Sequence, residues 1–557
     1  MKNFLYIAFL GLILLGNVTV QAQNNNPLEG QDSLVLENER INDVIDSDKP
    51  FIKPPYQEIK QGAQDKPTYQ SQEFYVETEF EPVPPRFKEV DPDEKNRYKN
   101  NLLRLGIGRY TTPLAQLYIN NGTDKDIDYG LNFTHLSAHN DEVRLRNFRE
   151  DYGTIYAKAF QGGNEFYGKL YLYNTQYFNY AGDDTTLIEG DEQARSDSLI
   201  MGFTRFAIEA GVASAYDPDN EYYYDVPLDL RIYGDRRSNN EFNIGVKPKV
   251  GARFGEEASL GLDSELRYVA GGIGDSNQNR FFVVLNPAFQ FKNDKFKAKV
   301  GINYSYFNNS IDSSGFSNLG PDIEASYAIN PASLTAFVGV TSGMQAPTYE
   351  SMIVENRFIA RDVRISPTID RYQVYLGVKG NINQTIDFSA KGYYRKVSNQ
   401  LIYRSQDSIF FQALYDSSVN VTGAHLEVNY DLDENFAAGA ALNIDVYGTS
   451  NQDSLTPVFF HATPVRLDVF GQYTFAEKLT TEGKLQVFGP TPMSVDETGA
   501  TINRPLFLNV ALEADYRPVD NVSVFVRVNN LLGSNFQRWF NYPERRFDIM
   551  GGVTIAF

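Results

Sequence analysis

Apolar and polar residues alternate along the chain from Asn101 to Phe557. The clearest example is a pair of segments joined at Asn293-Asp294. One face of this pair carries Phe281, Val283, Leu285, Pro287, Phe289 and Phe291, followed by Phe296, Ala298, Val300, Ile302, Tyr304 and Tyr306. Because successive side chains of a strand point to opposite sides, the pattern predicts a hairpin with one apolar and one polar face.

The same alternation recurs in RYQVYLGVKG with QTIDFSAKGYYRK, and in LFLNVALEADY with VSVFVRV. Each segment has about ten residues, the length with which a tilted strand crosses a bilayer. Short and long connections alternate. The short ones are 120–125, 161–164, 292–294, 330–333, 381–385, 431–435 and 518–521, and the long ones include 138–151, 177–202, 343–369, 397–417, 448–463 and 489–504. Such sorting is typical of outer-membrane barrels, whose turns face the periplasm and whose loops face outside.

The sequence therefore predicts an all-β fold, a transmembrane antiparallel outer-membrane β-barrel over residues 101–557. We expect about 22 strands, with roughly 16 to 22 acceptable, because NLLRLGIGR and LAQLYIN could form one bent strand. The last segment carries Phe547, Ile549, Gly551, Val553, Ile555 and Phe557 on one face. In a closed barrel the last strand pairs with the first, so a chain can end inside the wall.

The N-terminal hundred residues have a different character. Residues 1–22 have the form of a secretory signal peptide, with Lys2, an apolar run from Phe4 to Leu15 and the small Ala22 at the cleavage point. Residues 23–100 are acidic and rich in proline, and no period of two or 3.6 persists. They are predicted to form an irregular arm, which either hangs in the periplasm or enters the lumen.

Composition narrows the function classes. Aromatic residues make up 14% of the chain, while the mean hydropathy is −0.39. This composition suits a membrane barrel and also a secreted sandwich or propeller, and the alternation of short and long loops favours the barrel. The net charge of −20 argues against nucleic-acid binding, which needs a basic surface. The absence of cysteine excludes disulfides, thiolate metal sites and a lipoprotein anchor.

The C-terminal stretch VRVNNLLGSNFQRWFNYPERRFDIMGGVTIAF resembles the end of TonB-dependent receptor barrels. The matching positions are Asn530-Leu531-Leu532, Trp539, Tyr542-Pro543, Arg545 or Arg546, and Phe557. RYQVYLGVKGNINQTIDFSAKGYYRKVSNQLIY is similar to a mid-barrel hairpin of the same family. The resemblance implies an outer-membrane receptor-type barrel, and the terminal Phe557 resembles the signal read by barrel-assembly machinery. Residues 23–100 are too short and irregular for the family's plug domain, so we expect a barrel without it.

The predicted lumen face is polar and of mixed sign. It carries Lys297, Lys299, Lys379, Asp387, Lys391, Arg395, Glu513, Asp515, Arg527 and Asp548. A wetted wall with internal ion pairs is the favoured interpretation, and a solute-selecting surface is the alternative. A wide barrel must also be filled by something or left as an aqueous channel.

Two features suggest chemistry. His135 and Ser137 share the predicted lipid face, which resembles outer-membrane phospholipases and lipid A deacylases, where a histidine activates a serine. Asn140 or Asp141 is the predicted third group, and a polar pair at a strand end is the favoured alternative. The loop 182–198 gathers Asp183, Asp184, Glu189, Asp191 and Glu192, but their spacing matches no standard calcium loop. No catalytic, cofactor-binding or metal-binding residue is assigned.

These observations favour a pore or transport component for solutes in the outer membrane of a Gram-negative cell. The alternative is a structural or accessory subunit of a secretion, export or barrel-assembly complex, and a lipid hydrolase using His135 and Ser137 is the third hypothesis. The expected partners are outer-membrane lipid, the barrel-assembly machinery, and proteins bound through residues 23–100 and the long loops. No cofactor and no nucleic acid is expected.

Overall fold

A computed structural model of the protein describes residues 101–121, 127–139, 146–179, 200–214, 221–312, 315–331, 333–383, 385–405, 410–433, 435–449, 460–495 and 500–557. The predictions of a signal peptide and an arm fall on residues 1–100, outside the described residues. Strands contain 77% of the described residues, and they pair in antiparallel fashion. Within it, no helix is both long and apolar enough to cross a membrane.

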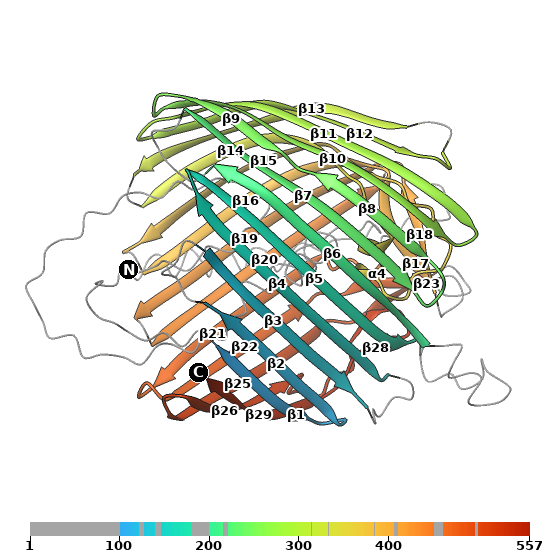
Figure 1. The fold of residues 1–557 in the computed structure, drawn as a ribbon, viewed down its shortest axis with the longest axis vertical. Helices are drawn as coiled ribbons and strands as arrows, with labels where there is room; N and C mark the ends of the chain where they lie inside the picture. Colours follow the sequence, from blue (N-terminus) through green and yellow to red (C-terminus); the bar gives the residue numbers. More distant parts are fainter. Residues whose placement is uncertain are drawn as a thin grey trace, which may run out of the picture.

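The strands form one closed sheet, a barrel whose strands are strongly tilted (Figure 1). The sheet contains 23 segments, but β8 and β9 are two halves of one wall strand, interrupted at Lys247 and Pro248, which leaves 22 wall strands in the described chain. The wall strands are β1 (Leu102–Gly108), β2 (Thr112–Asn120), β3 (Ile127–Ala138), β4 (Phe148–Gln161), β5 (Asn164–Phe178), β6 (Ile200–Ser214), β7 (Tyr222–Asp235), β8 (Asn240–Val246) with β9 (Lys249–Phe254), β10 (Ala258–Ile273), β11 (Ser276–Lys292), β12 (Phe296–Asn309), β13 (Phe316–Asn330), β14 (Leu334–Gln345), β15 (Thr368–Ile382), β16 (Ile386–Ser398), β19 (Val419–Asp433), β20 (Phe436–Thr449), β21 (Val465–Phe475), β22 (Leu479–Phe488), β25 (Phe507–Val519), β26 (Val522–Asn529) and β29 (Asp548–Ala556).

The barrel closes where the two ends of the described chain meet. β29 pairs with β26 on one side and with β1 on the other, from Leu102↔Ala556 to Gly108↔Met550. The backbone of Phe557 exchanges two further hydrogen bonds with Asn101, at 3.0 and 3.2 Å. The predicted fold and the pairing of the last strand with the first are therefore confirmed. The first two segments are separate strands, β1 and β2, and not one bent strand.

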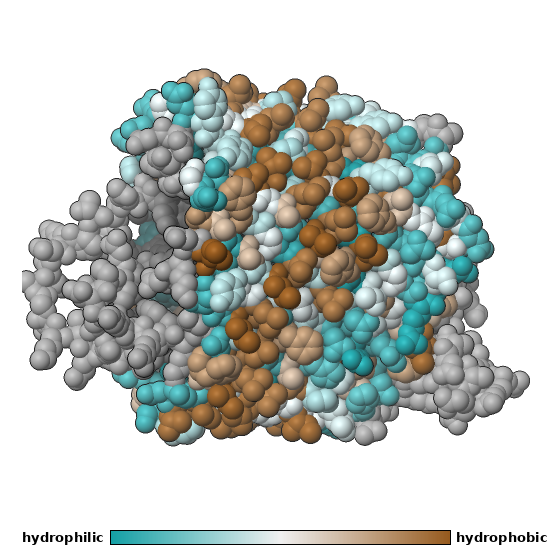
Figure 2. All heavy atoms as spheres, in the orientation of Figure 1, coloured by the Kyte–Doolittle hydropathy of each residue, from teal (hydrophilic) through white to brown (hydrophobic). Residues whose placement is uncertain are grey.

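Side-chain exposure follows the predicted alternation. On β11, Phe281 and Phe289 are 43% and 45% exposed, whereas Phe282 between them is 5% exposed. Apolar side chains gather over the middle of the outer wall (Figure 2). Strands as long as the 17 residues of β11 exceed the ten or so that span a bilayer, so they continue beyond it.

Connections differ between the two ends of the barrel, as the sequence predicts. At one end, the turn end, hairpins such as β4–β5 turn over two residues, Gly162 and Gly163. At the other, the loop end, most connections are longer and carry additional elements. These are α4 (Tyr349–Glu355), β17 (Gln400–Ser405), β18 (Phe411–Asp416), β23 (Thr491–Val495), β24 (Thr501–Arg504), β27 (Gln537–Trp539) and β28 (Tyr542–Pro543).

Three tyrosines of the lumen face link neighbouring strands in the same way. Tyr167 on β5 is the register partner of Gly211 on β6, and its ring fills the space that a Cβ on Gly211 would occupy. Its hydroxyl continues to β7, where it donates to Asp225 at 2.6 Å. The two other sets are Tyr375 with Gly339 and Glu324, and Tyr393 with Gly423 and Asp445. We call these sets the tyrosine braces, because each ties three consecutive strands.

Candidate functional site

The loop between β14 and β15, residues 346–367, folds into the lumen at the loop end, and we call it the inner loop (Figure 1). It contains α4, whose N-terminus has a capping box: Thr348 Oγ1 accepts from the Ser351 amide at 3.0 Å, and the Thr348 amide donates to Ser351 Oγ at 2.9 Å. Tyr349, Met352 and Ile353 are at most 1% exposed. A seven-residue helix is marginal by itself, so packing against the wall holds it.

A buried carboxylate of the wall fixes the start of α4. Both oxygens of Glu241, on β8, accept backbone N–H groups, from Tyr349 and Glu350, each at 2.9 Å. Arg280, on β11, donates to the same carboxylate, and both side chains are 2% exposed. The negative charge of Glu241 lies at the positive end of the helix dipole and is balanced by the guanidinium of Arg280. These partners offset the cost of burying the carboxylate.

Two more arginines, one on the wall and one in the β7–β8 connection, bind the inner loop. Arg205 on β6 donates to Glu350 Oε1 at 3.0 Å, and this pair is also almost completely buried. Arg237 donates to the hydroxyl of Tyr349 at 2.6 Å and to the carbonyl oxygen of Ile359 at 2.7 Å. Asn239 donates to the same hydroxyl at 2.7 Å. The helix is therefore held to the lumen face by charge-assisted hydrogen bonds as well as by apolar contacts.

The rest of the inner loop is fastened through its backbone. Wall side chains donate to three of its carbonyl groups: Tyr177 to Arg357 at 2.8 Å, Asn309 to Ile365 at 3.1 Å and Gln278 to Val363 at 3.4 Å. These donors lie on β5, β12 and β11. The loop thus follows the inner surface of about a third of the barrel and narrows its loop end.

Neighbouring loop elements complete the closure. The β17–β18 hairpin pairs with the inner loop through Phe411, which exchanges backbone hydrogen bonds with Phe358 and Ala360. The ring of Phe358 stacks on Tyr542 with centroids 3.5 Å apart. Together they form one buried apolar cluster, whose members are Tyr177, Met201, Phe203, Tyr233, Ile273, Tyr349, Met352, Ile353, Phe358, Ile359, Val363, Ile365, Leu401, Tyr403, Phe411, Trp539 and Tyr542.

Two ionisable groups in this region have shifted pKa values. Burial raises the pKa of Glu355, the last residue of α4, to about 7, although the Tyr403 hydroxyl donates to its carboxylate at 2.9 Å and Arg538 also favours the charged form. Burial lowers the pKa of His461 to about 3, so this histidine is neutral between Phe411 and Trp539. The region between the inner loop and the β17–β18 hairpin therefore favours uncharged groups.

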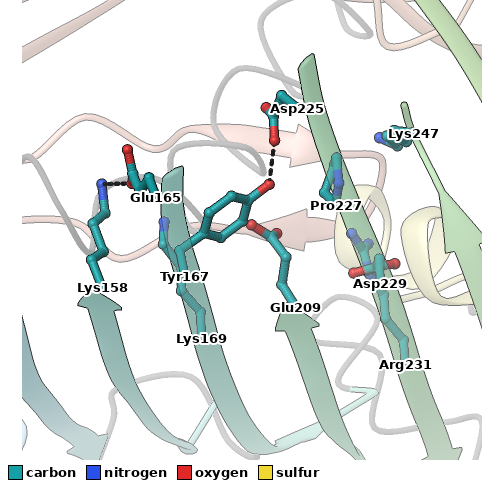
Figure 3. A pocket seen from close by; sticks show the side chains of 10 residues that line it. All are labelled: Lys158, Glu165, Tyr167, Lys169, Glu209, Asp225, Pro227, Asp229, Arg231 and Lys247. Atoms are coloured by element: carbon teal, nitrogen blue, oxygen red, sulfur yellow. Dashed lines mark hydrogen bonds and ion pairs between the residues drawn. The ribbon is translucent and has the colours of Figure 1, made fainter. Parts of the chain in front are cut away.

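The lumen wall outside the inner loop has the mixed polar lining that the sequence predicts. Lys299 pairs with Asp322 at 2.7 Å, Arg395 with Asp370 at 2.7 Å and Arg527 with Glu513 at 2.8 Å. Towards the turn end, a cavity of about 300 Å³ opens on the lumen face (Figure 3). It is lined by four bases, four acids, a tyrosine and a proline: Lys158, Lys169, Arg231, Lys247, Glu165, Glu209, Asp225, Asp229, Tyr167 and Pro227.

The structure brings His135 and Ser137 together as the sequence suggested. His135 Nε2 lies 3.2 Å from Ser137 Oγ. The third group is Asp151 on β4, whose Oδ1 lies 2.6 Å from His135 Nδ1, and sequence reasoning missed it because it enters from the neighbouring strand. The proposed partners Asn140 and Asp141, and the acidic loop 182–198, lie outside the described residues. Among described residues, no group of three or more His, Asp or Glu side chains is placed to hold a metal ion.

No family model matches the chain, and no curated protein matches its sequence. Solved structures match its fold. The FrpB iron transporter from Neisseria meningitidis has a TM-score of 0.65 at 12% identity, over 82% of this chain and 81% of that one. The ferripyoverdine receptor of Pseudomonas aeruginosa has 0.64 at 12%, over 82% and 71%. The ferric-catecholate import receptor Fiu from K12 E. coli has 0.62 at 9%, over 83% and 82%.

These similarities define the class of protein. The chain folds as a closed outer-membrane type of β-barrel with 22 wall strands. More particularly, it has the barrel fold of TonB-dependent receptors, as its C-terminal motifs indicate. The three proteins named above are an iron transporter and two receptors. The described residues contain no plug domain, and the expectation that the plug is missing stays a prediction because residues 1–100 are not described.

Proposed function

We propose that the protein is a transport component of the outer membrane, a receptor-type barrel whose inner loop gates a polar lumen. The observation that carries the proposal is the position of the inner loop, fixed across the loop end above an ion-paired wall. Hydrophilic solutes suit such a wall, because it is polar and carries charges of both signs, several of them in ion pairs. The names of the structural neighbours, an iron transporter and import receptors, support the same class of function.

In this proposal the turn end faces the periplasm and the loop end faces the exterior. The support is the sorting of short and long connections, which outer-membrane barrels share. The inner loop then meets an incoming solute first, and the cavity of Figure 3 lies on the exit side.

Conductance and solute flux test the proposal. Wild-type protein and a variant with residues 349–365 replaced by a short Gly-Ser linker are reconstituted in planar bilayers and in liposomes loaded with sugars, amino acids or small peptides. We expect rare openings for the wild type, and larger, frequent openings with faster solute flux for the variant. If neither protein conducts or admits any solute, the lumen is blocked independently of the inner loop and the transport proposal fails.

A second function is favoured by the strength of the closure. A barrel whose loop end is narrowed by a segment held with buried ion pairs and a 17-residue apolar cluster also suits a structural or accessory subunit of an outer-membrane secretion, export or assembly complex. Affinity purification of the tagged protein from native membranes in mild detergent separates the two. A stoichiometric set of protein partners, together with no conductance, supports the subunit, whereas a solitary conducting barrel supports transport.

A further inference from the structure

The outer face of the barrel carries a polar row that the transport function does not use. In register across four strands, the outward residues are His135 on β3, Asp151 on β4, Asn174 on β5 and Thr204 on β6. The outward residues one step nearer the turn end include Phe133, Leu172 and Phe206, all exposed. The row therefore lies on the loop-end side of exposed apolar residues, and because the strands are tilted (Figure 1) it runs obliquely along the edge of this part of the apolar wall.

Three members of this region have the geometry of a nucleophile, a base and an orienting acid. Asp151 Oδ1 accepts from His135 Nδ1 at 2.6 Å, which leaves Nε2 as the acceptor facing Ser137 Oγ at 3.2 Å. Arg149 donates to the other oxygen of Asp151 at 2.6 Å and so fixes the orientation of the carboxylate. A serine is activated when a histidine accepts its proton and an acid holds the tautomer of that histidine.

We propose that Ser137, His135 and Asp151 form an acyl-hydrolase site on the outer wall, acting on fatty-acyl esters of the surrounding outer-leaflet lipid. Ser137 and His135 are the catalytic residues, and Asp151 is a positioning residue. The position argues for the substrate, because the polar side chains adjoin exposed apolar ones on the outer wall, as lipid ester groups adjoin the hydrocarbon. On the other side of the site, Leu105 and Ile107 of β1 are 47% and 66% exposed and provide an apolar surface for the acyl chain.

The chemical step balances with water as the second reactant. Ser137 Oγ attacks the ester carbonyl carbon while its proton passes to His135 Nε2, and the carbonyl electron pair moves onto oxygen. Arg149, the register partner of Ser137, places a positive charge beside this oxyanion. Collapse breaks the ester C–O bond, the alcohol leaves with the proton from Nε2, and the acyl group stays on Ser137. Water then attacks through the same base, releases the fatty acid and restores the serine.

The reaction requires that the ester group of a lipid reach Ser137 Oγ. Ser137 is 3% exposed, so an ester reaches Oγ only when a covering side chain moves. The site is therefore obstructed in this conformation, and we expect a low turnover rather than that of an unobstructed hydrolase.

The test uses the full-length purified protein in vesicles of phosphatidylethanolamine and phosphatidylglycerol, and separately in vesicles that contain lipopolysaccharide. Released fatty acid is measured by mass spectrometry, and an alkyl fluorophosphonate probe reports on the nucleophile. We expect release from one or both lipids, labelling at Ser137, and loss of both signals in Ser137→Ala and His135→Ala. Release from phospholipid alone or from lipopolysaccharide alone identifies the source of the ester.

Two further variants separate catalysis from structure. Asp151→Asn should lower the rate by about 10²- to 10⁴-fold and move the acidic limb of the pH–rate profile to lower pH, because the imidazolium loses its partner. Thr134→Ala removes a buried hydroxyl from the same strand on the lumen side and should leave the rate unchanged. No fatty acid from either lipid, or equal release by the wild type and Ser137→Ala, overturns the proposal. Neither result bears on conductance.

Discussion

Replacing Glu241 with alanine should release the inner loop. The change removes the acceptor for the amides of Tyr349 and Glu350 and leaves Arg280, 2% exposed, without its carboxylate. Removing one partner of a buried ion pair costs about 3 to 5 kcal/mol. The loss falls on the docked state alone if Arg280 regains water once the loop leaves. At about 1.4 kcal/mol per factor of ten, the ratio of released to docked loop should rise roughly 10²- to 10⁴-fold.

The absence of cysteine from the chain makes a clean assay possible. Met352→Cys places a single thiol on the buried face of α4, where the native side chain is 1% exposed. The rate of its reaction with a water-soluble thiol reagent reports how often the loop leaves the wall. Labelling should be about 10²- to 10⁴-fold faster with Glu241→Ala than without it.

A matched control is available on the same lumen face. Glu265 on β10 also pairs with an arginine, Arg267, but at a site away from the inner loop. Glu265→Ala in the Met352→Cys background should label at the parent rate. In planar bilayers, the Glu241→Ala protein should open more often than the parent, and the Glu265→Ala protein should open as often as the parent. Equal labelling of the Glu241→Ala and Glu265→Ala proteins would refute the reasoning.

Two further predictions concern pH and packing. Burial raises the pKa of Glu355 from 4.5 to about 7, so its contribution to stability is complete below pH 4.5 and is lost as pH rises through 7; at pH 8.5 the charged group costs about 3 kcal/mol. Glu355→Gln should therefore slow hydrogen exchange of the inner loop at pH 8.5 and have little effect on it at pH 4.5. The control, Glu256→Gln at an exposed position, should change the exchange rate at neither pH. Equal effects of Glu355→Gln at both pH values would contradict the assigned pKa shift. Gly339→Ala should displace the Tyr375 ring and lower the free energy of unfolding by about 1 to 3 kcal/mol. The control, Gly471→Ala, adds a methyl group where no atom lies within reach, so it should leave the free energy of unfolding unchanged. Denaturant unfolding in detergent compares the two variants, and equal losses of stability would show that the Tyr375 ring does not matter.

The wall strands could be predicted from the sequence because the alternation of apolar and polar residues is a local property of each strand. Alternation fixes which side chains face lipid, so the faces of Phe281 and Phe282 followed directly. The closing role of the last strand followed from the closed topology. One named uncertainty in the strand count lay at residues 109–111, where a tight hairpin turn joins β1 to β2.

The site was less predictable because it is built from distant segments. The sequence showed residues 343–369 only as a long link, although Thr348 and Ser351 before the apolar Met352 and Ile353 are the local signal of a capped helix. Nothing local indicates that Glu241, more than a hundred residues earlier, receives that helix. Asp151 was missed for the same reason, since its contact with His135 depends on strand pairing.

The tyrosine braces have a consequence for how the barrel is assembled. A pairing error of two residues keeps every apolar side chain on the lipid side, so hydrophobicity cannot distinguish it from the correct pairing. Such an error would move Tyr375 from Gly339 onto Phe337 or Thr341, where a side chain occupies the space its ring needs, and would take its hydroxyl away from Glu324. The tyrosine braces therefore favour the correct strand register over pairings shifted by two residues, which the apolar outer face alone would not distinguish.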